Sequence, residues 1–323
     1  MRYHCIHCYH ELEVLPAGGE CPSCGRRYPR VAGLLDLRVA PDCYLSLDDE
    51  RAKAERLAGH ETDTDVLGLA SVYYSMTDDV DEARRRRFLA HIAHAESRGS
   101  ALAAAIPAGS RVLEVGCGTG GFLVAARRAG LEVVGADVAT RWLVVARRRL
   151  ADRGLSAPIV GANAERLPWA DASFDVVVAD SVLEHLADPL AALREWRRVV
   201  RPGGRLLVWS PNRYTLLPDP HVGLWGLGWL PRRWAPAYVR LRRGLPWSVR
   251  PLSTREALDL AAKAGWRAVE AGPIEVPASW ARGAATRAAI RSYRVACATR
   301  AGRAIVGHVG PLWQVSACRE EAA

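Results

Sequence analysis

The chain alternates short apolar runs with amphipathic stretches from residue 107 to residue 212, and this alternation restricts its fold more than any other feature. The runs "RVLEV", "LEVVGAD", "APIVGAN", "FDVVVADSV" and "GRLLVWSPN" have the length and β-branched content of buried strands. Helical stretches lie between them, two of which end at Gly130 and Gly154. Such alternation predicts an α/β, doubly wound parallel sheet, which binds ligands beyond the carboxyl ends of its strands.

The loop after the first of these strands, in "VLEVGCGTGG", has two interpretations. Gly116, Gly118 and Gly121 form a literal G-x-G-x-x-G, which is typical of NAD-dependent oxidoreductases. Gly116, Gly118 and Gly120 behind Glu114 form instead the kind of loop that holds S-adenosylmethionine. Both interpretations need the same sharp turn and the same free backbone N–H groups, so the loop alone does not choose between them.

Asp137 ends the second strand, about 20 residues beyond the loop, where an acid can accept both hydroxyls of an adenosine ribose. NAD and S-adenosylmethionine share that ribose. Asp137 therefore predicts an adenosine cofactor of either kind.

Three segments taken together carry a family resemblance. The loop "VLEVGCGTG", the segment "GANAERLPWADASFDVV" and the turn "VVRPGGRLLV" resemble the class I S-adenosylmethionine-dependent methyltransferases. The resemblance covers residues 106–212 and resumes near residue 250. It implies a Rossmann-like, seven-stranded methyltransferase sheet in which the last strand, "PLWQVSACRE", is antiparallel beside the sixth.

The resemblance also implies which residues bind the cofactor. Glu114 and the loop backbone would position its methionine end, Asp137 its ribose, and Asn163 with Ala164 its adenine. Aspartate is common in the family where this chain has Asn163, but an amide can still hydrogen-bond the adenine edge. Asp180, after the fourth strand, would lie near the methyl-bearing sulfur. The complete predicted cofactor set is Glu114, Gly116, Cys117, Gly118, Gly120, Asp137, Val138, Asn163, Ala164 and Asp180.

Two histidines are candidates for a catalytic base. His185 lies in "DSVLEHLADP" after the fourth strand, and imidazole is the side chain best suited to remove a proton near neutral pH. His221 follows Asp219 and Pro220 in a later insertion and is the second candidate. The Glu-His pair can instead pack or cap the turn, and positioning of the reactants can make a dedicated base unnecessary.

Residues 213–250 interrupt the alternation with a stretch dense in Trp, Pro, Gly and Arg, which we interpret as a lid. Trp225, Trp229, Trp234 and Trp247 could line an acceptor pocket, stack on a sugar or base, or make peripheral contact with a membrane. They could equally pack within a compact lid, and the sequence leaves these alternatives open.

The first segment contains two C-x-x-C pairs, Cys5 with Cys8 and Cys21 with Cys24. Without an export signal, disulfides are not expected, and four thiolates at this spacing predict one closed, structural Zn²⁺ site. The segment resembles the zinc-ribbon modules found in front of some bacterial methyltransferases. The expected domains are a ribbon over residues 1–40, a helical cover over 41–105 and a methyltransferase domain over 106–323 that contains the lid.

Composition supports a soluble protein, since half of the 323 residues are hydrophobic and no run approaches the about 18 apolar residues of a membrane span. We expect a cytoplasmic location. The net charge of +9 suggests nucleic acid as a partner. However, Lys53 and Lys263 are the two lysines and the arginines are scattered, which favours solvated helix faces over a nucleic-acid patch.

The predicted function is transfer of a methyl group from S-adenosylmethionine to a small-molecule, glycosylated or lipid-linked acceptor, at oxygen. An RNA methyltransferase that grips RNA through its zinc ribbon is the first alternative, and a catalytically inactive, cofactor-binding partner subunit is the second. An NAD-dependent oxidoreductase is the last. The acceptor and the oligomeric state do not follow from the sequence.

Overall fold

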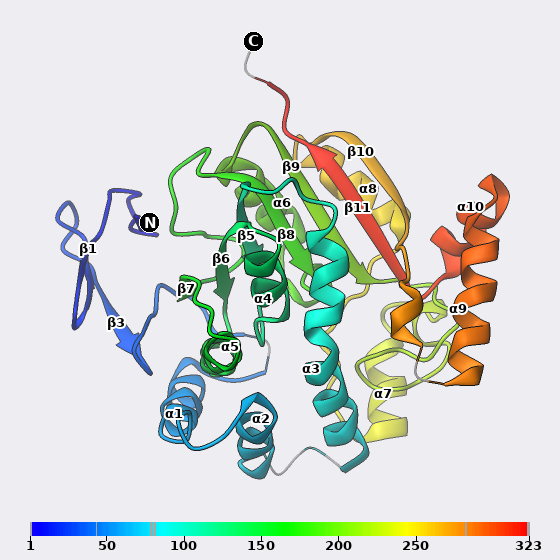
Figure 1. The fold of residues 1–323 in the computed structure, drawn as a ribbon, viewed down its shortest axis with the longest axis horizontal. Helices are drawn as coiled ribbons and strands as arrows, with labels where there is room; N and C mark the ends of the chain where they lie inside the picture. The colour runs from blue at the N-terminus through cyan, green and yellow to red at the C-terminus, as the bar shows by residue number, and fades with distance from the viewer. Residues whose placement is uncertain (1, 43, 78–79, 81, 282, 322–323) are drawn as a thin grey trace. The chain divides into compact units, whose positions relative to one another are not determined.

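A computed structural model describes residues 2–42, 44–77, 80, 82–281 and 283–321 (Figure 1). The chain divides into two compact units, each described here by itself. Unit 1 comprises Met1–Val178 and Arg198–Arg201, and unit 2 comprises Ala179–Arg197 and Pro202–Ala323.

Unit 1 begins with a small antiparallel sheet of order β1-β2-β3-β4. Its strands are β1 (Glu13–Leu15), β2 (Gly18–Glu20), β3 (Arg27–Val31) and β4 (Leu34–Leu35). The loops around these strands bring the two C-x-x-C pairs together. The segment "YPRVAGLLDLR" contains most of the hairpin of β3 and β4.

Three helices follow the ribbon in unit 1, namely α1 (Leu47–Ala58), α2 (Val66–Ser75) and α3 (Glu82–Ala103). Ser46 and Asp65 cap the first two, because each side chain accepts a hydrogen bond from a backbone N–H of the first turn. Before residue 77 the chain therefore forms two separate helices, and Gly59 is the C-cap of the first.

The main sheet has seven strands in the order β10-β11-β9-β8-β5-β6-β7. They are β5 (Arg111–Val115), β6 (Glu132–Asp137), β7 (Ile159–Gly161), β8 (Phe174–Asp180), β9 (Val200–Pro211), β10 (Arg267–Pro273) and β11 (Leu312–Cys318). The strand β6 pairs in parallel with β5 and with β7. The strand β11 lies between β9 and β10 and is antiparallel to both, which confirms the predicted fold class.

The remaining elements connect these strands. The helices α4 (Gly121–Arg128) and α5 (Thr140–Asp152) belong to unit 1. Unit 2 contains α7 (Ala235–Arg243), α8 (Thr254–Lys263), α9 (Ala284–Cys297), α10 (Arg300–Val309) and the short 3-10 helices η1 (Leu183–His185), η2 (Leu227–Trp229) and η3 (Ala278–Trp280). The helix α6 (Pro189–Val199) leads into β9, and the Asp188 side chain caps its start by accepting a hydrogen bond of 3.0 Å from the Ala191 N–H. Among the described helices, none combines the length and the apolar character needed to cross a bilayer.

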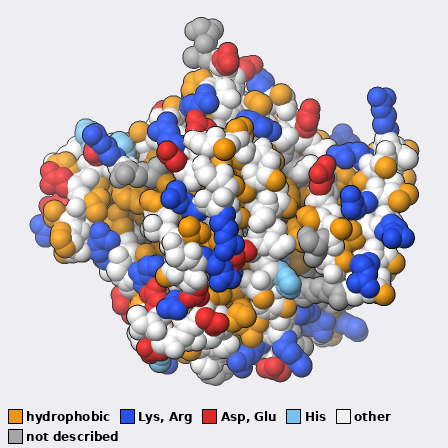
Figure 2. Space-filling model, viewed as in Figure 1, with side chains coloured by type: hydrophobic (Ala, Val, Ile, Leu, Met, Phe, Trp, Pro, Cys, Tyr) orange, Lys and Arg blue, Asp and Glu red, His pale blue; other side chains and the backbone are white. Residues whose placement is uncertain are grey.

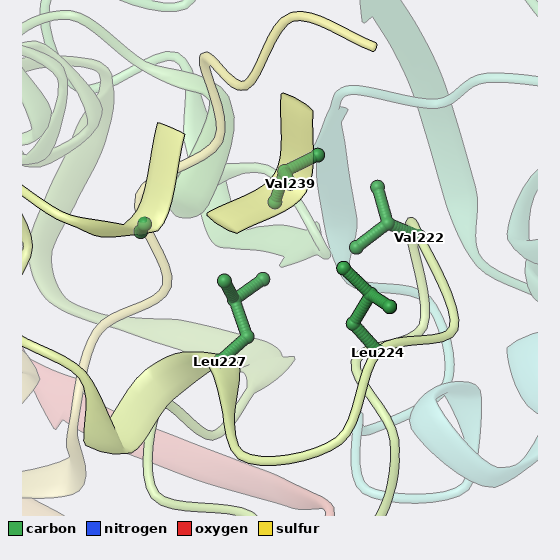
Figure 3. Packing of buried hydrophobic residues seen from close by; sticks show 5 residues of the cluster. Val222, Leu224, Leu227 and Val239 are labelled. Carbon is green, nitrogen blue, oxygen red and sulfur yellow. The ribbon is translucent and has the colours of Figure 1, made fainter. Parts of the chain in front are cut away.

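The predicted lid, residues 213–250, contains a small apolar core of its own. Figure 3 shows Val222, Leu224, Leu227 and Val239 directed toward one another, and all four are buried. Tyr238, Leu245 and Trp247 pack against this cluster. The lid is therefore a packed element rather than a loose loop.

Charged side chains of both signs share the surface. Lys and Arg side chains are spread over the face in Figure 2 and stand among acidic ones. This distribution agrees with the scattered arginines of the sequence.

Candidate functional site

The glycine loop follows β5 in unit 1 and turns through three left-handed residues, Gly116, Gly118 and Gly120, with φ of 72°, 47° and 74°. Such angles favour glycine, since a Cβ would be strained there. A Cβ built at Gly118 would meet no atom within 4 Å, so the space beside this residue is open to a ligand. The loop leads directly into α4, whose N-cap Gly120 makes no side-chain capping hydrogen bond.

Gly121 has a different role from the other glycines of the loop. A Cβ at Gly121 would lie 2.5 Å from the backbone carbon of Ala95 in α3, and one at Gly99 would lie 2.6 Å from the Cα of Phe122. The two glycines allow α3 and α4 to approach closely. The literal G-x-G-x-x-G ending at Gly121 is thus accounted for by helix packing.

Asp137 ends β6 and is tied to the glycine loop. Its Oδ2 accepts a hydrogen bond of 2.7 Å from the Gly118 N–H, and its Oδ1 accepts one of 2.7 Å from the Ala139 N–H. Burial raises the pKa of Asp137 to about 6, although these two hydrogen bonds act in the opposite direction. The carboxylate is held at the strand end where a ribose can be recognised.

Asn163 follows β7 and holds the segment that leaves the ribbon. Its Oδ1 accepts hydrogen bonds from the N–H of Val39 at 2.8 Å and of Ala40 at 3.3 Å. Its Nδ2 donates to the Ala40 carbonyl at 3.2 Å. The bonds that the structure shows for this amide therefore order residues 39–40, and the predicted contact with adenine remains a prediction.

A buried ion pair fixes the same segment to the second strand end. Arg38 donates to both carboxylate oxygens of Asp36, at 2.7 and 2.8 Å, and also to the Val138 carbonyl at 2.9 Å. Asp36 pairs with Gly161 of β7 as an isolated parallel bridge. The exit from the ribbon therefore extends the β7 edge and contacts Val138, beside Asp137.

The other predicted cofactor residues lie on the same elements. Glu114 is buried at the end of β5, and Cys117 is buried in the loop, where burial raises the pKa of its thiol well above the ordinary value. Ala164 is buried next to Asn163. Unit 1 thus brings together all of the predicted cofactor set except Asp180.

Unit 2 brings the two candidate bases together. The rings of His185 and His221 have centroids 5.1 Å apart and stand nearly perpendicular. One nitrogen of each ring and a carboxylate oxygen of Glu184 lie within 4.8 Å of one another. Asp219 Oδ1 lies 3.4 Å from His221 Nδ1. These four side chains, Glu184, His185, Asp219 and His221, are called the histidine cluster below.

Glu184 is the fully buried member of the histidine cluster. Its Oε2 accepts a hydrogen bond of 2.9 Å from the Ser210 hydroxyl, and its Oε1 lies 4.0 Å from His185 Nε2. Burial raises the pKa of Glu184 to about 7. A carboxyl group with such a pKa can exchange a proton with imidazole near neutral pH.

Strained backbone precedes the histidine cluster. Asp180 ends β8, and Ser181 follows it with φ of 59°. A left-handed conformation is uncommon for a residue with a side chain and is concentrated at functional positions. The Ser181 hydroxyl donates to Asp180 Oδ1 at 3.1 Å.

Comparisons with known proteins agree with this arrangement. The family described as "Methyltransferase domain" matches residues 113–208. The "Ubiquinone biosynthesis O-methyltransferase" of Cereibacter sphaeroides is 35% identical over 180 residues, which cover 55% of this chain and 69% of that protein. The chain belongs to the S-adenosylmethionine-dependent methyltransferases.

Two other similar proteins are methyltransferases by name. The "Demethylmenaquinone methyltransferase" of Thermus thermophilus is 40% identical over 119 residues, 36% of this chain and 51% of that protein. A solved structure of a methyltransferase from Thermotoga maritima aligns with 73% of this chain and 94% of its own, with a TM-score of 0.48 and 20% identity. Membership of the family overturns the oxidoreductase alternative and confirms the predicted class I methyltransferase.

The unit 1 residues of this methyltransferase suit its cofactor. The open space beside Gly118 can admit the cofactor, the first turn of α4 offers backbone donors, and Asp137 can accept the ribose hydroxyls. When bound, S-adenosylmethionine supplies a methyl group that is activated by a neighbouring sulfonium.

The four cysteines of the methyltransferase have the arrangement of a metal site. The sulfur atoms of Cys5 and Cys24 lie 3.6 Å apart, those of Cys8 and Cys21 lie 3.4 Å apart, and all four lie within 4.8 Å of one another. A tetrahedral Zn²⁺ with ordinary bond lengths would set its sulfur ligands about 3.8 Å apart. The donor set therefore fits such an ion.

Sequence reasoning missed three contributors to these sites. Glu184 appears in the sequence only as part of the Glu-His pair, and its contact with Ser210, 26 positions away, has no local signal. Arg38 and Asp36 were not singled out, because nothing local shows that the ribbon exit meets β7. The lid tryptophans also differ in their exposure to solvent. Trp225, Trp229 and Trp234 are exposed, whereas Trp247 is partly buried.

Proposed function

We propose that this methyltransferase methylates a hydroxyl group of a small molecule, and that the histidine cluster accepts the hydroxyl proton. The observation that carries the proposal is the meeting of His185, His221 and the buried Glu184 in unit 2. The names of the similar quinone-pathway O-methyltransferases support oxygen as the methylated atom.

The reaction needs a positioned hydroxyl and a place for its proton. As the acceptor oxygen forms its bond to the methyl carbon, the bond between sulfur and carbon breaks and its electron pair stays on sulfur. The hydroxyl proton passes to an imidazole nitrogen of His185 or His221. Glu184 and Asp219 would steady the resulting imidazolium, because a carboxylate close to imidazole favours its charged form. Asp180 and Ser181 would help to hold the reacting group.

In unit 1, the glycine loop, Glu114 and Cys117 would bind the methionine end of the cofactor, and Asp137 with Val138 would bind its ribose. Asn163 and Ala164 would lie toward the adenine. We further propose that Cys5, Cys8, Cys21 and Cys24 bind one structural Zn²⁺, with residues 1–40 as its ribbon, 41–105 as a helical cover and 106–323 as the methyltransferase domain.

The test is a methyl-transfer assay with isotopically labelled cofactor on a panel of catechols and the matching aromatic amines. Labelled product from the catechols, with the label on oxygen by mass spectrometry, is expected. His185→Ala and His221→Ala should lower kcat, by at least about 100-fold for the residue that serves as base, because a positioned general base contributes roughly 100- to 10,000-fold. His60→Ala is the control, since His60 is an exposed residue of unit 1.

Two outcomes would contradict the proposal. One is methylation of amines in preference to hydroxyls, and the other is unchanged kcat in both histidine variants. RNA labelled in preference to every small molecule would favour the nucleic-acid alternative instead.

A further inference from the structure

A cavity of about 460 Å³ lies in unit 2, within the lid and the chain that leaves it. Its walls come from residues 212–236 at the beginning of the lid and from residues 247–251 at its end. The apolar lid core adjoins the cavity, because Leu224 and Leu227 belong to that core and also line the cavity. The cavity thus has a preformed apolar wall.

Four arginines line the same cavity, and two of them are fixed in place. Arg213 and Arg232 both approach Oε1 of Glu256, at 3.6 and 2.7 Å. Glu256 is itself held by the N–H and the hydroxyl of Ser253, each at 2.9 Å, in the capping box of α8. Arg213 also donates to the Gly228 carbonyl at 3.1 Å. One carboxylate therefore orients two guanidinium groups at the cavity wall.

The other two arginines, Arg233 and Arg250, have no carboxylate within ion-pair distance among the described residues. The only acidic residue that lines the cavity, within the described part of the chain, is Asp219. Its Oδ1 already accepts hydrogen bonds from the N–H of His221 and of Val222, at 2.9 and 3.1 Å. The wall therefore keeps an excess of positive charge that the lid itself does not neutralise.

The cavity adjoins the histidine cluster. Asp219 belongs to both, and Trp247, which lines the cavity, has its ring centroid 6.1 Å from that of His221. The backbone N–H of Arg250 donates to the Glu184 carbonyl at 2.7 Å, which links the arginine wall to the buried acid. A molecule seated in the cavity would meet Asp219 and Trp247, and both of these residues lie beside His221.

We propose that this cavity binds the acceptor, and that the acceptor is an amphipathic anion. Its anionic group, a phosphate ester or a carboxylate, pairs with Arg233 and Arg250. Its apolar part lies on Leu224, Leu227 and Trp247, and the hydroxyl to be methylated faces His221. This inference rests on the proposed O-methylation and adds the substrate class to it.

Binding of decyl phosphate below its micelle concentration tests the site by calorimetry, without any turnover. Decyl phosphate should bind at least about 10-fold more tightly than inorganic phosphate or the neutral decyl maltoside, because the cavity offers both charge and apolar surface. Decanoate in a parallel titration distinguishes a carboxylate from a phosphate as the preferred anion. Arg233→Ala/Arg250→Ala should weaken decyl phosphate at least about 10-fold, since two charge-assisted contacts are lost.

Arg242→Ala is the matched control, because Arg242 is an exposed arginine of α7 that does not line the cavity. It should leave all titrations unchanged. In the catechol assay, decyl phosphate should compete with the acceptor and not with S-adenosylmethionine.

Equal binding of decyl phosphate and decyl maltoside, or equal affinity in the double variant and the wild type, would overturn the inference. Adsorption to phosphatidylglycerol vesicles without binding of monomeric decyl phosphate would overturn it too, in favour of a membrane surface. If decyl phosphate binds as expected while no hydroxyl is methylated, the proposed function fails and the anion site stands.

Discussion

Asp137 is a titratable member of the proposed cofactor set, and its pKa of about 6 lies close to neutral pH. The ionised carboxylate can accept two ribose hydroxyls, whereas the protonated acid loses part of that capacity. Since the pKa of Asp137 is about 6, its ionised fraction rises as the pH increases from 5 to 7. We predict that S-adenosylhomocysteine binds roughly 10-fold more tightly at pH 7 than at pH 5. Calorimetry at each pH measures this change.

The variant Asp137→Asn tests whether the pH dependence of S-adenosylhomocysteine binding comes from the Asp137 carboxylate or from another titrating group. The amide cannot ionise, so the variant should bind more weakly at pH 7 and should show a flat pH profile between 5 and 7. A profile as steep as that of the wild type would assign the pH dependence to another residue.

The raised pKa of Glu184 should make the free energy of unfolding depend on pH. Its pKa is about 7 in the folded protein and 4.5 in the unfolded chain, so the folded state holds the proton longer. The free energy of unfolding therefore falls as the pH rises from about 4.5 to 7, by roughly 3 kcal/mol at most. Glu184→Gln removes this loss, and its stability relative to the wild type should increase with pH across that window.

Urea unfolding of both proteins at pH 5 and pH 8 tests this expectation, and the difference between them cancels the pH dependence of the rest of the chain. A difference that stays constant between the two pH values would show that Glu184 ionises normally.

At the scale of elements, the contact between α3 and α4 offers a test of whether Gly121 serves helix packing or ligand binding. Gly121→Ala places a methyl group 2.5 Å from Ala95 backbone, and such overpacking costs about 1–3 kcal/mol. We predict lower stability in thermal unfolding with little change in S-adenosylhomocysteine affinity. Weakened S-adenosylhomocysteine binding with unchanged stability would contradict this prediction. It would assign Gly121 to ligand binding instead of helix packing.

The strands and helices between residues 107 and 212 were predictable because their periodicity is local. The antiparallel β11 was predictable only through the family resemblance. The bond between Asn163 and Val39 joins residues 124 positions apart, and no local pattern encodes it. For the same reason, no local pattern predicts that His185 and His221 meet or that Glu184 lies buried beside them.

The lid shows the same limit. Its composition predicted an aromatic, basic element but not which tryptophans face solvent. Ser253 and Glu256 form the capping box of α8, which is a local motif, but the second use of Glu256, to orient Arg213 and Arg232, depends on the folded lid.

At the scale of the molecule, the ribbon and the predicted cofactor residues other than Asp180 belong to one unit, and residues 36–40 connect them. Asn163 holds Val39 and Ala40, and Arg38 contacts the Val138 carbonyl beside Asp137. If the four cysteines bind Zn²⁺ as proposed, removing the ion removes the four-thiolate staple of the ribbon, since small zinc modules draw their stability from the ion. The segment that orders the second and third strand ends would then be released.

We therefore predict that removing Zn²⁺ with a strong chelator weakens S-adenosylhomocysteine binding several-fold, although Cys5, Cys8, Cys21 and Cys24 are not members of the proposed cofactor set. Calorimetry before chelation, after chelation and after Zn²⁺ is restored measures the change. Asn163→Ala should weaken S-adenosylhomocysteine binding in the zinc-loaded protein. Chelation should change the affinity of this variant less, because it already lacks the side-chain hydrogen bonds to Val39 and Ala40. An equal affinity for S-adenosylhomocysteine with and without metal, at a zinc content shown to differ, would contradict this prediction. It would mean that folding of the ribbon does not affect the proposed cofactor site.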